Sequence, residues 1–452
     1  MSPLLPLLVL AAAGRSTSPP PIQSHTCANG LTVLVVENHS EPLVTVEITA
    51  KNGSMTEPPD YNGLSHLYEH MFFKANKALP SQEAWRAHAQ ELGLSYNGHT
   101  KTEQVNYFFS TTKDHLASSI QLMHDAIVYP LFDQKELERE RVVVTGEIDR
   151  NEANPFYQLA HAVDQRVWWK YPSRKDSLGL RSTVLKTTRA QMQTIQHRYY
   201  VPNNSALVVT GDVSAAAVFA QADALFTDWP RGEDPFVKYP LVTHPPIPKT
   251  EAVVVVQPVH VIDGQLVWHG PSTVGPSVPD TYAVDALSTA LRVPSSRFQK
   301  ALVDAGACVT VRFSWYTQMN TGPITASFEA TPDKVDTCIR AIRAELAKMT
   351  AHYVTPEDLA RGAHQLEVDV VQKRERPSEL AHTLTFWWTS AGLDYYLGYV
   401  DNLYKVTPGD AARFVATYIT GKPFVLGVLV SPEMQKGGLD AAHFQKLVEE
   451  AP

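Results

Sequence analysis

The segment His66-Leu67-Tyr68-Glu69-His70 carries the residue types of a metal centre with a built-in base. Two histidines four positions apart lie on one face of an α-helix, so both imidazoles can reach a single ion. Glu69 is three residues after His66, which places its carboxylate close to the same face. A carboxylate beside an open zinc position can accept a proton from metal-activated water. The spacing therefore predicts hydrolytic metal chemistry on one helix.

Seventeen histidines in the chain leave a second interpretation open, an amphipathic helix with two histidines at its surface. A third ligand has to decide, because two imidazoles leave zinc under-coordinated. The candidate lies on a downstream helix that should begin at Asp133, with Glu136 as its capping-box partner. Glu140 and Glu147 are seven positions apart and therefore share a face of that helix. Glu136 and Glu138 are interpreted as solvated surface charge.

Glu147 follows three valines, a threonine and Gly146, in the more apolar part of the helix. A carboxylate in such surroundings needs a partner. A glycine in a helix interior costs about 1 kcal/mol relative to alanine. Gly146 is tolerable there if another backbone segment must approach closely. Glu147 is therefore a candidate for the third ligand.

These residues stand in segments that resemble the pitrilysin, insulin-degrading-enzyme and mitochondrial-processing-peptidase family. Residues 62–74 are similar to the zinc helix of that family, and residues 138–148 to its third-ligand helix. Glu140 and Glu147 also follow His70 at the two intervals that the family has. Three more segments carry the resemblance, which spans residues 25–430: they are residues 29–36, 97–100 and 199–212.

The resemblance implies one Zn²⁺ per chain, held by His66, His70 and Glu147, with Glu69 as the general base. Glu140 is implied to orient a ligand, as metal sites generally require. Manganese or cobalt could occupy the same donors. The order His-x-x-Glu-His is the inverse of the commoner zinc-protease motif and defines the inverzincins.

Residues around Asn97 resemble the strand beside the active site in this family. Its peptide substrates add to a sheet edge there as an extended strand, which uses main-chain hydrogen bonds and tolerates varied sequences. The resemblance therefore implies that a peptide substrate binds near Asn97.

One constant interval relates the two halves of the chain. It separates Trp168 from Trp387 and Thr188 from Thr407, and the register holds as far as Val209, which indicates a duplication. Clustered strands and long amphipathic helices in each copy are typical of an α+β fold. The resemblance implies two tandem homologous α/β-roll domains, each a mainly antiparallel sheet with helices packed on one face.

Four segments are expected along the chain. They are a signal peptide or disordered leader (1–21), the metal-bearing domain (22–234), a proline-rich linker (235–249) and the homologous domain without metal ligands (250–452). Only the first copy can bind the metal. The same interval leads from its four site residues to positions of the second copy that cannot reproduce the site, and these hold Asp285, Ser288, Thr289 and Leu366. The resemblance implies that the second domain presents substrate or closes a chamber over the first.

The second domain departs from the family where self-sufficient members offer an arginine and a tyrosine to the zinc site. Val303 and Val309 stand at those positions. An aliphatic side chain donates no hydrogen bond to an oxyanion, and losing one such donor costs roughly 2.7–4 kcal/mol. We therefore expect a heterodimer in which a related zinc-free subunit supplies the pair. Arg312 and Tyr316 of this chain are the alternative source.

Composition excludes other classes of protein. The 452 residues, 44% of them hydrophobic, allow two or three domains with sizeable cores. A net charge of −8 without a basic stripe argues against nucleic acid. No run of about twenty apolar residues follows the N-terminus, so no membrane span is expected. Cys27, Cys308 and Cys338 lack metal-motif spacing and are interpreted as small buried hydrophobes, at least one of them unpaired.

The N-terminus predicts export. Residues 4–13 are apolar and end in small residues, and a proline-rich stretch follows, as in a secretory signal that lacks its positive start. The periplasm or the cell exterior is therefore expected, and a disordered tail on a cytoplasmic protein is the alternative.

Together these residues predict a zinc-dependent endopeptidase subunit that hydrolyses peptides or small unfolded polypeptides. The alternative is a non-catalytic structural or assembly subunit, like the respiratory-complex core proteins that share the family's fold. Such proteins typically have eroded motifs, whereas all four residues of the first half are intact here.

Overall fold

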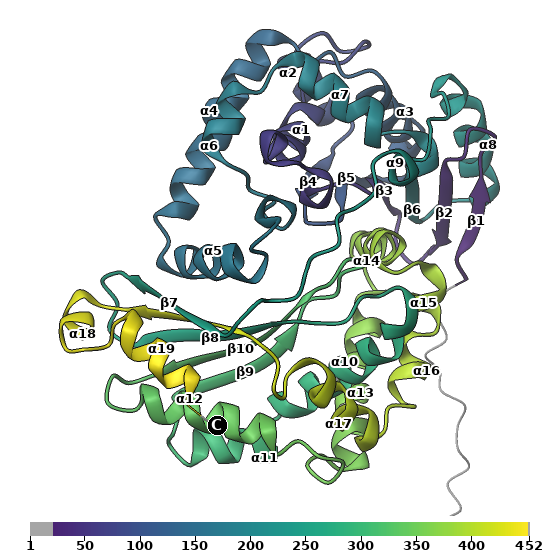
Figure 1. Ribbon diagram of the computed structural model, residues 1–452. Helices are drawn as coiled ribbons and strands as arrows, with labels where there is room; N and C mark the ends of the chain where they lie inside the picture. The colour runs from purple at the N-terminus through teal and green to yellow at the C-terminus, as the bar shows by residue number, and fades with distance from the viewer. Residues whose placement is uncertain (1–20, 451–452) are drawn as a thin grey trace, which may run out of the picture.

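The computed structural model describes residues 21–450 and contains two sheets, one from each half of the chain (Figure 1). Helices pack against both sheets, so the predicted α+β fold with two tandem domains is confirmed. The expected leader falls on residues 1–21, of which 1–20 lie outside the described residues. The predicted linker begins with one helical turn, α9 (Pro235–Lys238), and continues as irregular chain to the second sheet.

The first sheet has six strands in the order β1-β2-β6-β3-β5-β4. Only β2 and β6 pair in parallel, and the other neighbours are antiparallel. The strands are β1 (Gln23–Thr26), β2 (Thr32–Glu37), β3 (Leu43–Ala50), β4 (Ser95–Thr100), β5 (Val105–Thr112) and β6 (Ser205–Gly211). Because β4 ends the order, one of its sides has no strand partner in the sheet.

The second sheet has five strands in the order β7-β11-β8-β10-β9. Its one parallel pair is β7 with β11, which corresponds to β2 with β6 in the first sheet. The strands are β7 (Glu251–Val256), β8 (Ile262–His269), β9 (Thr310–Trp315), β10 (Pro323–Ala330) and β11 (Val425–Val430).

Helices pack on each sheet to form two cores of buried aliphatic and aromatic side chains. Those of the first half are α1 (Leu64–Phe72), α2 (Gln82–Glu91), α3 (Leu116–Val128), α4 (Gln134–Glu152), α5 (Pro155–Val167), α6 (Arg181–Lys186), α7 (Arg189–Tyr199) and α8 (Ala215–Leu225). Those of the second half are α10 (Val278–Arg292), α11 (Arg297–Gln299), α12 (Val335–Ala347), α13 (Pro356–Gln372), α14 (Pro377–Ser390), α15 (Leu393–Leu397), α16 (Tyr399–Leu403), α17 (Pro408–Tyr418), α18 (Pro432–Lys436) and α19 (Ala441–Glu449). Within residues 21–450, none of the helices combines the length and the apolar character that crossing a bilayer demands.

Corresponding elements recur at the constant interval that relates the two halves in sequence. Helices α7 and α17 coincide residue for residue when shifted by that interval. Each begins with a threonine N-cap, Thr188 or Thr407, and each cap forms a capping box with the third residue of its helix. The strands that follow, β6 and β11, lie in corresponding places in their sheets, each beside the strand with which it pairs in parallel.

Each half of the chain contributes one helix that packs on the sheet of the other half. Helix α5 of the first half packs on β7, β8 and β11 of the second sheet, and α14 of the second half packs on β3 and β6 of the first sheet (Figure 1). Both contacts are apolar: Val163 of α5 and Val425 belong to one buried cluster, and Leu384 of α14 and Val208 belong to another. Each sheet is therefore covered on its second face by the other half of the chain.

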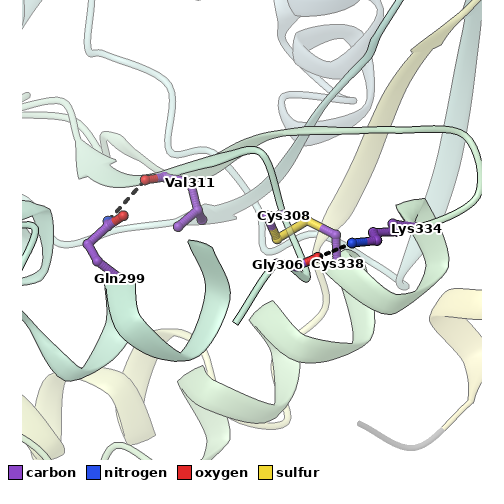
Figure 2. The surroundings of a disulfide bond; sticks show 6 residues. All are labelled: Gln299, Gly306, Cys308, Val311, Lys334 and Cys338. Carbon is purple, nitrogen blue, oxygen red and sulfur yellow. Dashed lines mark hydrogen bonds between the residues drawn. A yellow bond between two sulfur atoms is a disulfide. The ribbon is translucent and has the colours of Figure 1, made fainter. Parts of the chain in front are cut away.

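All three cysteines are buried and one of them is unpaired, as expected, but the other two are bonded to each other. Cys308 and Cys338 form a disulfide between the loop before β9 and helix α12 (Figure 2). Nearby, Lys334 Nζ donates a 2.9 Å hydrogen bond to the carbonyl of Gly306. Sequence spacing does not reveal this pair, because the two residues are 30 positions apart and meet only through the packing of α12. Cys27 is free and buried.

Candidate metal centre

Helix α1 begins without a capping side chain of its own. Its N-cap, Gly63, has a φ of 94°, in the left-handed region that favours glycine. Glu57 supplies the missing acceptor, because its carboxylate accepts hydrogen bonds from the backbone N–H groups of Gly63 (2.8 Å) and Ser65 (2.6 Å). Burial raises the pKa of Glu57 to about 7, against the lowering effect of these bonds. Glu57 thereby fixes the first turn of the helix that carries His66 and His70.

Helices α1 and α4 bring three donor side chains together. His66 Nε2 lies 3.3 Å from Glu147 Oε2, and His70 Nε2 lies 3.6 Å from the same oxygen. The two imidazole rings meet edge to face, with centroids 5.1 Å apart. One donor atom from each of the three residues lies within 4.8 Å of the others. Two imidazoles and one carboxylate fit the set of three protein ligands that a catalytic zinc site uses.

The charges around this cluster favour a cation. The hydrogen bond from His66 lowers the pKa of Glu147 by more than burial raises it. Burial disfavours the charged form of His66, but its hydrogen bond to Glu147 and the nearby charge of Glu69 outweigh burial and raise the pKa of His66. Positive charge is therefore stabilised where the three donors meet, which is the electrostatic requirement of a divalent cation.

Glu140 lies behind His70 as seen from the donor cluster. One of its oxygens is 3.0 Å from His70 Nδ1, and the other is 2.7 Å from Lys74 Nζ. Burial acts to raise the pKa of Glu140, but hydrogen bonds from His70 and Lys74 outweigh it and lower the pKa. An acceptor at Nδ1 fixes the ring so that Nε2 faces Glu147. Glu140 thus contacts a ligand candidate, His70. Lys74, which was not singled out from the sequence, contacts Glu140 in turn.

The carboxylate of Glu69 is held by the edge strand β4. Thr100 Oγ1 donates a hydrogen bond of 2.6 Å to Glu69 Oε2. A Cβ at Gly98 would lie only 2.8 Å from Glu69 Cγ, so a residue without a side chain is what lets Glu69 lie this close to the strand. Reasoning from the sequence missed both contacts, although both residues belong to the segment 97–100 that carries part of the family resemblance.

Asn97 lies on the same strand but outside the donor cluster. Its side chain is exposed and accepts a hydrogen bond from the backbone N–H of Gly98 (2.9 Å). Within the described residues, β4 pairs only with β5, so its other edge is open. An open edge presents main-chain groups that an extended peptide can pair with.

Three expectations about α4 are wrong: solvation of Glu136, its capping box with Asp133, and a second backbone close to Gly146. Glu136 is 7% exposed and not solvated, since it accepts hydrogen bonds from the backbone N–H groups of Ala75 (3.0 Å) and Gln82 (2.8 Å). Its side chain therefore joins the segment after α1 to the start of α2, while Asp133 caps α4 with its own carboxylate. Within residues 21–450, no atom beyond the adjoining part of α4 lies within 4 Å of the place where a Cβ on Gly146 would be, so no second backbone among them requires this glycine.

In the second half, the corresponding positions hold no metal-type cluster among the described residues. Asp285, Ser288 and Thr289 lie on α10, and Leu366 lies on α13, two helices that pack together as α1 and α4 do. Asp285 accepts hydrogen bonds from Trp315 Nε1 (2.6 Å) and from a tyrosine hydroxyl instead. The second copy has therefore kept the helix pair and replaced the donors with core packing.

The positions of the expected arginine and tyrosine lie close to the disulfide. Val303 is in the helical segment Lys300–Asp304 and packs against the second core, while Val309, which is 47% exposed, precedes β9. Tyr316 follows β9 and lines a small cavity with residues 101–104, and Arg312 is exposed on β9. None of the donor cluster lines that cavity.

A two-domain fold with an inverted His-x-x-Glu-His helix defines a class of zinc peptidases. Two family models match this chain: "Insulinase (Peptidase family M16)" over residues 32–174 and "Peptidase M16 inactive domain" over residues 186–366. The chain belongs to peptidase family M16, and the resemblance found in the sequence is confirmed. The first match contains all four residues of the candidate centre.

Curated relatives carry zinc-protease and processing-peptidase names. The chain is 26% identical over 193 residues to the "Uncharacterized zinc protease YmxG" of Bacillus subtilis, covering 43% of this chain and 47% of that protein. It is 25% identical over 372 residues to the "Zinc protease PqqE" of Helicobacter pylori, covering 80% and 82%. It is 24% identical over 394 residues to the "Probable mitochondrial-processing peptidase subunit beta, mitochondrial" of Arabidopsis thaliana, covering 83% and 72%. The match to YmxG thus spans about half of that protein, and the match to bovine insulin-degrading enzyme spans 22% of it.

Solved structures share the fold. A protease from Helicobacter pylori superposes with a TM-score of 0.81 at 22% identity, covering 91% of this chain and 99% of that chain. The first half of the periplasmic protease PqqL from Escherichia coli gives a TM-score of 0.77 at 18% identity, covering 96% and 97%. At these identities the likeness concerns the fold alone.

Proposed function

We propose that this chain is a zinc-dependent endopeptidase subunit that hydrolyses peptides or small unfolded polypeptides. The observation that carries the proposal is the convergence of His66, His70 and Glu147 within 4.8 Å, beside Glu69 on the same helix as the two histidines. Zinc held by these three side chains would polarise the scissile carbonyl and activate a water molecule for attack.

The chain's own residues supply the proton transfers and the positioning. Glu69 accepts the proton of the attacking water and hands it to the leaving amine, which is general acid–base catalysis by one carboxylate. Thr100 donates to one oxygen of Glu69 and so orients the other. Glu140 fixes the ring of His70 through Nδ1.

The substrate is proposed to add to the open edge of β4, near Asn97. Main-chain pairing there would place the peptide beside Thr100 and the Glu69 carboxylate that Thr100 contacts. Because strand addition reads the backbone, the reaction should accept varied sequences in an extended or unfolded state.

The test is the variant Glu69→Gln, which keeps the shape of the side chain and removes its basicity. Zinc content should stay at the wild-type level, while hydrolysis of an unfolded polypeptide should fall by at least about 10²-fold. Glu138→Gln, a change at an exposed residue of α4, is the matched control and should keep full activity. Retained turnover in Glu69→Gln would refute the role of Glu69.

We propose that a second, related subunit without zinc completes the site. Val303 and Val309 stand where an arginine and a tyrosine are expected, and neither can donate to an oxyanion. A relative that is 24% identical is itself named as one subunit of a processing peptidase. Purified chain should therefore show little activity alone and gain activity when a zinc-free paralogue is added. Full activity of the chain alone would overturn this part of the proposal and favour Arg312 or Tyr316.

A non-catalytic structural role is the alternative function. The description "inactive domain" applies to the model that matches residues 186–366, and no donor cluster corresponds to it among the described residues of the second half. Metal analysis separates the two proposals, because a purely structural subunit has no use for zinc at His66, His70 and Glu147.

Export to the periplasm or the cell exterior is proposed from two observations. The N-terminal apolar run predicts a signal, and the Cys308–Cys338 disulfide is of a kind that persists in oxidising compartments. Thiol titration of the unfolded protein from its native source should give one thiol per chain before reduction and three afterwards. Three thiols without reduction would favour the cytoplasmic alternative.

A further inference from the structure

A second group of metal-type donors lies at the opposite end of the first sheet from β4. Among the described residues, 21–450, two groups of three or more such side chains bring one donor atom each within 4.8 Å of the others, and the second consists of His25, Cys27 and Asp223. His25 Nε2 is 2.9 Å from Asp223 Oδ1. The sulfur of Cys27 lies within 4.8 Å of a donor atom of each of the other two residues. Nothing in the proposed peptidase reaction uses these residues.

The backbone around Cys27 is rigid. The carbonyl of Cys27 accepts from Gly30 N (2.8 Å), and Cys27 N donates to Leu31 O (2.9 Å), which closes the turn between β1 and β2. The side chain of Asn29 ties this turn to the segment that follows α8 by donating to the carbonyls of Phe226 (2.8 Å) and Trp229 (2.9 Å). The sulfur and the carboxylate are therefore held on two elements whose separation is fixed by other bonds.

The imidazole of His25 is positioned from two sides. Strand β1 pairs with β2 and places His25 opposite Val33. The ring of Phe219, one turn before Asp223 on α8, lies with its centroid 5.2 Å from that of the imidazole. Asp223 is close to the C-terminal end of α8 (Ala215–Leu225), where the helix dipole adds partial negative charge. The fold thus presents the donors with an electrostatic preference for a cation.

The donor types decide which cation fits. A thiolate, an imidazole and a carboxylate together suit Zn²⁺ or a similar borderline transition metal, and not Mg²⁺ or Ca²⁺, which prefer oxygen ligands. Cys27 is 6% exposed, whereas the side chains of His25 and Asp223 are 34% and 48% exposed, so solvent reaches the group on the side of these two residues. Water from that side can complete a tetrahedral set.

We propose that His25, Cys27 and Asp223 form a second zinc site, structural in role, that clamps the N-terminal edge strand β1 to helix α8. Binding replaces the thiol proton of Cys27, which passes to solvent, with a sulfur–metal bond. The clamp would fasten a strand whose one sheet partner among residues 21–450 is β2.

Cobalt substitution tests this site separately from the catalytic one. Thiolate bound to Co²⁺ absorbs in the near ultraviolet by charge transfer, and Cys27 is the one free cysteine of the chain, because Cys308 and Cys338 are bonded to each other. The donors of the proposed catalytic centre contain no sulfur. Full-length protein loaded with Co²⁺ should therefore show the thiolate band, and Cys27→Ser should lose it while keeping its fold by circular dichroism.

Zinc counting and thermal unfolding complete the test. Wild type should bind two zinc ions per chain, and Cys27→Ser and Asp223→Asn should each bind one, while Asp114→Asn, an exposed control, should bind two. Added zinc should raise the Tm of wild type more than that of either site variant. If the proposed catalytic site does not bind zinc, wild type should bind one zinc ion per chain and the two site variants none, and the thiolate band of wild type should remain. No thiolate band, with equal zinc in wild type and Cys27→Ser, would show a hydrogen-bonded cluster only and overturn the proposal.

Discussion

The hydroxyl of Thr100 donates a 2.6 Å hydrogen bond to Glu69, so the proposed base is held by the strand to which substrate is proposed to add. Gly98, two residues earlier, leaves the space in which the Glu69 side chain meets that strand. A peptide that pairs with β4 would order the strand and, through Thr100, the carboxylate. Substrate binding and the positioning of the base are therefore expected to be linked.

Replacing Thr100 with valine tests this link. The change keeps the branched shape and removes the donor, so Glu69 should lose its fixed orientation. We expect kcat to fall by about 10- to 100-fold, the usual cost of removing a partner that orients a catalytic group. Zinc content should be unchanged, and Thr100→Ser should recover most of the activity because it restores a hydroxyl. Equal kcat for Thr100→Val and wild type would show that the bond is incidental.

The effect of Glu140 should appear in metal affinity. Glu140→Gln removes the negative charge that His70 Nδ1 and Lys74 contact, so the His70 ring should be held less firmly in the orientation that faces Glu147. We expect zinc affinity to fall by about 10- to 100-fold, measured by competition with a chromogenic chelator. Glu138→Gln, two residues earlier and exposed, removes the same charge from the same helix. Equal losses in both variants would point to the net charge of α4 and away from a specific contact.

Glu57 should make the support of α1 depend on pH. Its pKa is about 7 in the folded chain, against an ordinary value of 4.5. Because the folded value is the higher one, the stabilising contribution is fully present below about pH 4.5 and is lost as the pH rises through about 7. Glu57→Gln does not titrate, so the Tm of wild type relative to the variant should decline between about pH 5 and about pH 8. A constant difference across that range would contradict the assignment.

The sequence was sufficient to predict the features that depend on local pattern or internal repetition. The spacing of His66 and His70 on one helix and the cap at Asp133 follow from rules within a few residues. The duplication was visible because one interval persists along the chain. Three-dimensional proximity of Glu147 to the histidines was anticipated through the family resemblance.

Contacts between distant segments could not be predicted in this way. Glu136 looked like a solvated charge within a charged run, and only the fold brings the backbone of Ala75 and Gln82 to its carboxylate. The Cys308–Cys338 pair likewise depends on how α12 packs. Gly146 led to the opposite error, because a glycine suggested that another segment packs closely, and within residues 21–450 no other segment does. In each case the residues that are close in the sequence do not indicate which residues of another helix, strand or loop are close in the fold.

The exchange of α5 and α14 between the halves predicts that neither half is stable alone. Residues 22–234 without the second half would expose Leu34 and Val208, which Leu380 and Leu384 of α14 cover in the chain. Each fully buried leucine contributes roughly 1.5–3 kcal/mol, so the two reciprocal contacts should hold the halves together without a covalent link.

A specific protease site inserted between Pro248 and Lys249, both exposed, allows the linker to be cut in the folded protein. The two fragments should then co-elute on size exclusion as one species of unchanged size. Leu384→Asp places a charge in the apolar contact with the first sheet, where an unpaired carboxylate is costly. This variant should separate into fragments after cleavage, while an exposed change such as Glu379→Gln on the same helix should not. Separation of the cut parent protein would show that each half folds on its own and that the exchanged helices add little to the stability of the pair.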